Sequence, residues 1–184
     1  MIELIVVVVI LGVMAAAIVP RMFGNEVRAA ENEVKQVTSF LSTVASRSAL
    51  SSQSLGIKYT AQSGRLELQS LRAKGNAGDF AATREFLPDP VTLPVNLSHV
   101  KVAVATVGGQ PADTANLWVE FAAGAPRPTV AFVLMYEKTK AWHVELSGDE
   151  SQAVSSVTEL NDNGGPRFVR TVDLDKVGGS QTPW

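Results

Sequence analysis

Hydrophobic residues fill the start of the chain without any alternation. From Leu4 to Val19 there are 16 residues without a charged or strongly polar side chain. As a helix this run is roughly 24 Å long at about 1.5 Å per residue. That is slightly less than the roughly 30 Å hydrocarbon core of a bilayer. With Met1 and Ile2 included, the pattern predicts an apolar helix over residues 1–24 that is just long enough to span a membrane.

Between residues 25 and 54 the pattern changes to a helical period. Apolar residues recur at spacings of three and four and form one stripe, made of Val27, Ala30, Val34, Val37, Leu41 and Val44. Asn25 is the expected N-cap, and Gly56 is the expected stop signal. Together the two segments predict one helix of about 50 residues, far longer than a usual globular helix. We expect a kink near Pro20, because proline removes a backbone donor and clashes with the preceding turn.

After Gly56 apolar and polar residues alternate with period two, which is typical of strands. The predicted strands are 57–61, 65–71, 100–106, 117–122, 129–136, 141–146, 155–160 and 168–174. Turn residues separate them, and the segment "LPDPVTLP" is expected to be a loop. A helix followed by strands predicts an α+β fold, in which the second half of the long helix packs on an antiparallel sheet head. Residues 25–184 would form this globular head.

Composition excludes several classes of function. The net charge is −2 over 184 residues, so there is no basic excess of the kind that nucleic-acid-binding proteins carry. The chain has no cysteine, which excludes disulfides, thiolate metal sites and cysteine nucleophiles. The only histidines, His99 and His143, are far apart in the sequence. No catalytic motif is present, and we predict that the protein is not an enzyme.

Glu3 is the exception in the apolar N-terminal segment. A charge at the end of a membrane helix can simply reach the water interface. Alternatively, the carboxylate requires a cationic partner from another chain, because an isolated buried charge must be paired or neutralised. Pro20 also has two interpretations, because a proline can kink the long helix or can simply end a membrane helix.

The segment "IELIVVVVILGVMAAAIVP" resembles the N-terminal signature of type IV pilins and type II secretion pseudopilins. That signature has a glutamate followed by leucine, then a valine- and isoleucine-rich run with small residues, and a proline 17 residues after the glutamate. Glu3 and Pro20 reproduce the spacing. The start departs from the family: Met1 replaces a leucine, and the preceding phenylalanine, threonine and leader are absent. Cleavage and N-methylation therefore cannot be inferred from these residues.

The resemblance implies a structural subunit that is stored in the bacterial inner membrane and polymerised through its N-terminal helix. The apolar half of that helix, residues 1–24, would then form the core of the filament. Glu3 would pair with the terminal amine of a neighbouring subunit, and Gly12 and Pro20 would allow the helix to break in the polymer. The implied partners are identical or homologous pilin subunits, the prepilin peptidase and the assembly platform. The filament would be a periplasmic pseudopilus or an extracellular pilus.

Within the superfamily, two later segments resemble the H-type, FimT-like minor pseudopilins. They are "FLSTVASRSALSSQSLGIKYTAQSGRLEL" and "LWVEFAAGAPRPTVAFVLMYEKTKAWHVELSG". This favours a pseudopilin of type II secretion. The alternatives are a major or minor pilin of a surface pilus, serving adhesion, motility or DNA uptake, and a singly anchored envelope enzyme or binding domain.

Oxygen ligands for calcium are concentrated near the C-terminus, at Asp149, Glu150 and Asp162. Their spacing matches no known calcium loop, and the same residue types are common in turns. We therefore expect no cofactor, with calcium as the weaker alternative. Trp118 and Trp142 fall in predicted strands, where core packing is the expected role.

Overall fold

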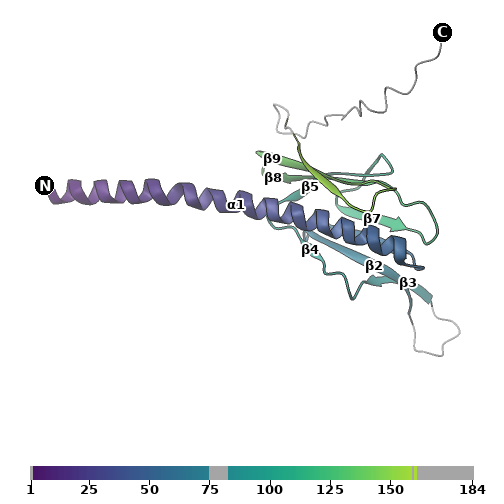
Figure 1. Cartoon of the computed structure of the whole chain (residues 1–184). Helices are drawn as coiled ribbons and strands as arrows, with labels where there is room; N and C mark the ends of the chain where they lie inside the picture. The colour runs from purple at the N-terminus through teal and green to yellow at the C-terminus, as the bar shows by residue number, and fades with distance from the viewer. Residues whose placement is uncertain (1, 75–82, 159, 161–184) are drawn as a thin grey trace, which may run out of the picture.

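A computed structural model describes residues 2–74, 83–158 and 160, without the side chains of 2–5, 15–24, 73–74 and 83. The first element is α1 (Ile2–Leu50), followed by a head built from strands. Figure 1 shows that the first half of α1 projects from the head and that its second half lies along it. Side chains of α1 are described in two stretches, 6–14 and 25–50, and only the second contributes to the core.

The strands of the head form two antiparallel sheets. The first has the order β3-β2-β1-β7, with β4 also paired to β2. It contains β1 (Leu55–Thr60), β2 (Arg65–Lys74), β3 (Thr83–Pro88), β4 (Val95–Asn96) and β7 (Asn116–Phe121). The second has the order β10-β9-β8-β5-β6. It contains β5 (Lys101–Val107), β6 (Gln110–Ala112), β8 (Val130–Tyr136), β9 (Lys140–Leu146) and β10 (Val154–Thr158).

The predicted fold class, a long N-terminal helix packed by its second half on one antiparallel sheet head, is wrong. More of the described residues lie in strands than in α1, and the strands form two sheets. The helix contacts β4 of the first sheet and β8, β9 and β10 of the second. The predicted kink near Pro20 does not interrupt α1, whose backbone is helical from Ile2 to Leu50. The alternation of apolar and polar residues indicates which face of a strand is buried, but it does not indicate how many sheets the strands form.

The core lies between the second half of α1 and the inner faces of both sheets. From the predicted stripe, Ala30, Val34, Val37, Leu41 and Val44 are buried. The sheets contribute alternate residues, of which the largest fully buried ones are Leu55, Ile57, Leu66, Leu68, Phe132, Leu134 and Leu146. At about 1.5–3 kcal/mol for each fully buried aliphatic or aromatic side chain, this packing is the main force that holds the helix to the head.

Several predicted boundaries change. The helix ends at Leu50, and Asn25 lies inside it, whereas Gly56 belongs to β1. Seven predicted strands correspond to β1, β2, β5, β7, β8, β9 and β10, while the segment 168–174 lies outside the described residues. Strands β3, β4 and β6 were not predicted. The first is rich in charged residues, and the other two are very short.

Candidate assembly site and its anchoring to the head

The described part of the projecting helix presents apolar side chains in every direction. Between Val6 and Met14, eight large apolar side chains are each 49–65% exposed. They are Val6, Val7, Val8, Val9, Ile10, Leu11, Val13 and Met14. A helix that is hydrophobic all round is normally buried in a core or in a membrane. This stretch therefore requires an apolar environment that the head does not supply.

Of the three predicted assembly residues, only Gly12 has a described environment. A Cβ built at Gly12 would meet no atom within 4 Å, so the helix surface is open there. The side chains of Glu3 and Pro20 lie outside the described residues. Where side chains are described, no helix is both long and apolar enough to cross a membrane.

Glu33 joins the helix to the loop before β5. Its carboxylate accepts hydrogen bonds from the backbone N–H groups of Ser98, His99 and Val100, at 3.0–3.2 Å. The Ser98 hydroxyl donates at 2.8 Å, and His99 Nδ1 lies 2.8 Å from Oε1. Only 7% of Glu33 is exposed. Burial alone would raise the pKa of this carboxyl, but the hydrogen bonds from His99, Ser98 and Val100 outweigh it and lower the pKa.

Asp89 provides a second buried carboxylate near the end of α1. It accepts a hydrogen bond of 2.8 Å from the backbone N–H of Thr92 and lies 3.1 Å from the Arg47 guanidinium. The Arg72 guanidinium is 3.5 Å from the same carboxylate oxygen. Burial opposes ionisation, yet Thr92 and the charge of Arg47 lower the pKa of Asp89. The carboxylate thus links α1, β2 and the loop after β3.

Arg127 connects three backbone segments. Its guanidinium donates to the carbonyl of Ala45 on α1 at 3.2 Å and to the carbonyl of Ser147 at 3.1 Å. It also donates to the carbonyl of Glu150. A single cation therefore holds the end of β9 and the following loop against the helix.

Two polar contacts mark the place where the helix leaves the head. The Tyr136 hydroxyl donates to Glu26 at 3.0 Å, and Lys140 Nζ is 3.0 Å from Glu31. The carboxylate of Glu26 is the main cause of the raised pKa of Tyr136. These contacts are exposed, and pairs of this kind contribute little to stability. The buried carboxylates are the stronger anchors.

The calcium candidates are not brought together with further ligands. Asp149 and Glu150 are exposed neighbours in one loop, and Asp162 lies outside the described residues. Among the side chains that the structure places, no group of three histidines, cysteines or carboxylates is arranged to hold a metal ion. The carbonyl of Glu150 accepts from Arg127.

Sequence reasoning missed the anchoring residues. A signal for Glu33 was available, because it lies three residues after Ala30 and four before Val37 and so shares the apolar face of the helix. Asp89 and Arg127 are both followed by proline in loops, where no periodic pattern indicates burial. The burial of Asp89 and the contacts of Arg127 depend on the tertiary structure.

Comparison with known proteins finds no match: no family model, no curated protein and no solved structure is similar to this chain. The functional argument therefore rests on the residues and their arrangement.

Proposed function

We propose that this protein is a non-enzymatic structural subunit of a pilus or pseudopilus filament. The subunit is stored in the bacterial inner membrane and polymerises through its N-terminal helix. A pseudopilin of type II secretion is the member of this class that the sequence resemblance favours. The observation that carries the proposal is the exposed apolar stretch from Val6 to Met14 on a helix that is anchored to a folded head.

The cost of leaving this stretch in water is large. Complete burial of an aliphatic side chain is worth about 1.5–3 kcal/mol, and eight such side chains are half exposed here. Lipid before assembly and neighbouring helices after assembly both remove this surface from water. An apolar surface alone does not fix the axial register between neighbouring helices. We assign the fixing of this register to Glu3. One buried acid with one complementary amine would fix the stagger, at some cost in stability.

The test compares Glu3→Ala with Glu120→Ala in the native cells. Glu120 is an exposed glutamate of the head, so the control removes the same charge elsewhere. We expect Glu3→Ala to insert in the membrane but to be absent from filaments, while Glu120→Ala assembles. Normal assembly of Glu3→Ala would contradict the register role of this residue.

Electron microscopy of sheared filaments, with mass spectrometry of their subunits, tests the class itself. A shaft made entirely of this chain would identify a major pilin, and trace amounts would indicate a minor subunit or pseudopilin. If the unmodified chain stays monomeric in the membrane under conditions in which filaments form, the protein is a singly anchored domain and the proposal fails.

A further inference from the structure

The outer face of the first sheet carries an aromatic pair that does not belong to the core. Trp118 of β7 reaches over β1, where a Cβ at Gly56 would lie 2.2 Å from an indole carbon. The indole also meets Phe86 of β3 edge to face, with centroids 4.7 Å apart and planes at 74°. Trp118 remains 40% exposed, so the core-packing role predicted for it is wrong, whereas Trp142 is buried as predicted.

Polar side chains beside this aromatic pair are held in place by one another. Glu67 of β2 accepts from Arg65 at 3.1 Å and from Gln69 at 2.9 Å. Lys58 of β1 lies between Glu67 and Trp118 in the register of the sheet. The face therefore combines an exposed aromatic surface with an ordered pair of charged side chains, Arg65 and Glu67, while Gln69 is buried beside them.

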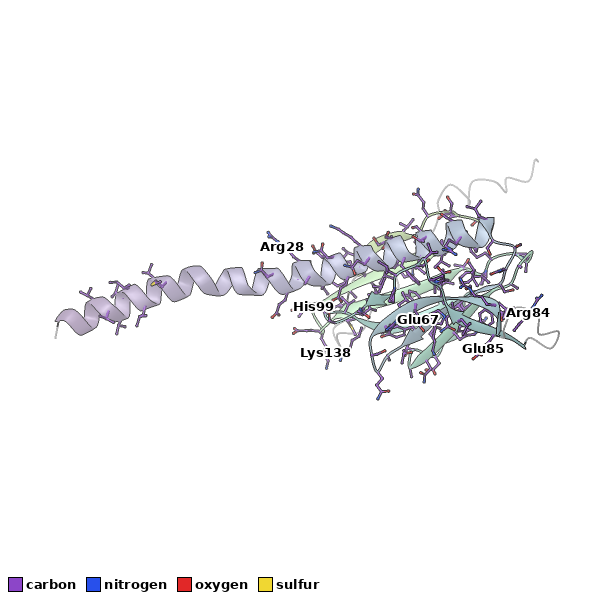
Figure 2. The ribbon with its side chains drawn as sticks, turned by 90° about the horizontal axis from the view of Figure 1, so that it is seen from below. Arg28, Glu67, Arg84, Glu85, His99 and Lys138 are labelled. Atoms are coloured by element: carbon purple, nitrogen blue, oxygen red, sulfur yellow. The ribbon has the colours of Figure 1, made fainter. Side chains whose placement is uncertain are left out.

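A cavity of about 490 Å³ opens at the Phe86 side of this face, where β2 and β3 extend beyond β1. Its lining contains two arginines, two serines, a glutamine and Leu71, the cross-strand partner of Phe86. Among the described residues that line it, none is a carboxylate. Glu85 lies opposite Arg72 in the register but is not part of the lining. Figure 2 shows Arg84 and Glu85 at the end of the head far from Arg28.

The cavity retains a positive charge. Arg72 donates from Nε to the Ser70 hydroxyl at 2.8 Å, which fixes its guanidinium. Its 3.5 Å contact to Asp89 is shared, because Asp89 also pairs with Arg47 at 3.1 Å. Asp89 thus faces two guanidinium groups, while Arg84 and its neighbour Glu85 add one charge of each sign, so three arginines stand against two carboxylates among these described residues. An anionic group is the complementary ligand, and guanidinium binds carboxylate with paired hydrogen bonds.

We propose that this face binds an acidic saccharide. The C–H face of a pyranose ring would pack on Trp118 and Phe86, with its hydroxyls near Arg65 and Glu67. The carboxylate of the same or the next sugar would enter the cavity between Arg72 and Arg84. The cavity volume is within the roughly 300–1,000 Å³ that is usual for ligand pockets. This site is independent of filament assembly, because it uses no residue of the projecting helix.

The experiment uses the full chain in a polyoxyethylene detergent, which has no sugar headgroup to compete. Binding of an oligogalacturonate of defined length is measured by calorimetry and compared with a neutral glucan of equal length and with inorganic phosphate. We expect oligogalacturonate to bind at least tenfold more tightly than the glucan. Trp118→Ala and Arg84→Ala should each weaken binding at least tenfold, and Trp118→Phe should weaken it less.

Arg28→Ala is the matched control, since it removes an exposed arginine from the helix far from the cavity. It should bind as the unmodified chain does. Urea unfolding of each variant identifies any loss of folding. Trp118→Phe keeps an aromatic ring for the sugar to pack on, whereas Trp118→Ala does not. The proposal would be overturned if oligogalacturonate did not bind, or if the neutral glucan bound equally tightly. It would also be overturned if inorganic phosphate bound with the same affinity as oligogalacturonate.

Discussion

Glu33 lies on the buried face of α1, and its carboxylate accepts hydrogen bonds from three successive backbone N–H groups, Ser98 to Val100. Carboxylates in such a site need no neighbouring ion, because oriented amide dipoles supply the stabilising charge. Removing the acceptor leaves the buried N–H of Val100 and the partly buried N–H groups of Ser98 and His99 without this partner. A buried unsatisfied polar group costs about 1–3 kcal/mol. Glu33 is therefore a sensitive contact between helix and head.

Glu33→Gln should lower the free energy of unfolding by about 2 kcal/mol, because the neutral amide accepts more weakly and its NH₂ group faces donors. Urea unfolding followed by circular dichroism measures the change. The control is Glu31→Gln on the same helix, whose partner Lys140 and own side chain are both more than 40% exposed. That change should stay within about 0.5 kcal/mol. Equal effects of the two substitutions would contradict the anchoring role of Glu33.

Acid should destabilise the head through Glu33 and Asp89. The pKa values of both carboxyls are lowered from ordinary values of 4.5 and 3.8. The unfolded chain therefore binds more protons than the folded chain as the pH approaches these lowered values. The contribution is complete above about pH 5 and is lost as the pH falls through the folded pKa values.

Unfolding free energies measured from pH 7 to pH 3 should fall at the acid end for the unmodified chain. The slope should be smaller for Glu33→Gln combined with Asp89→Asn, because neither side chain then titrates. An unchanged slope in the double variant would show that other groups control the acid limb.

At the scale of single elements, the turn between β1 and β2 depends on a glycine. Gly64, between β1 and β2, has a φ of +60°, and an added Cβ would lie 2.3 Å from the carbonyl oxygen of Leu97. Gly64 also accepts a hydrogen bond of 2.7 Å from the Leu97 N–H. The turn and the segment after β4 are therefore in direct backbone contact, with no room for a side chain.

Gly64→Ala should cost clearly more than Gly109→Ala. Gly109 has a φ of +78°, but a Cβ there would meet nothing within 4 Å. Gly109→Ala should therefore lower the free energy of unfolding only by the strain of a positive φ, about 1–2 kcal/mol. Gly64→Ala adds to this strain a steric clash with the backbone at Leu97. Thermal and urea unfolding of both variants measure the difference. Equal losses would show that the segment at Leu97 moves aside without cost.

Strand prediction succeeded where a segment alternated or formed a short apolar run, as β8 does, and failed where neither pattern was present. The sequence "NLWVEF" alternates, and β7 indeed alternates between exposed and buried residues. Strand β3 reads "TREFLP" and ends in proline, which suits its position at the edge of the sheet but gives no strand signal. Strands of two or three residues, such as β4 and β6, are defined by their partners rather than by their own residues.

At the scale of the whole molecule, the apolar stretch and the folded head are physically separate in one chain. Core residues of α1 begin at Ala30, and the described residues before Asn25 are exposed. A variant that begins at Asn25 should keep its unfolding free energy within about 1 kcal/mol of the full chain, with Asn25 acting as the new N-cap. Circular dichroism with urea measures the stability of both proteins.

The same shortened variant should be monomeric in detergent-free buffer, as measured by light scattering, whereas the full chain should associate. The physical reason is the loss of the half-exposed apolar side chains from Val6 to Met14. A shortened variant that fails to fold would show that residues 1–24 contribute to the head. A folded variant that still associates would place the association surface on the head.

Local sequence patterns encode the apolar N-terminal segment as an unbroken hydrophobic run, and they encode the buried stripe of the second half of α1 and most strands as a period or a short apolar run. Tertiary structure alone decided that the strands form two sheets and that the helix contacts both. It also decided that Trp118 lies outside the core and that Glu33, Asp89 and Arg127 anchor the helix. These features depend on contacts between residues far apart in the chain, such as the pairing of β1 with β7. Local periodicity contains no information about which distant partner a residue meets.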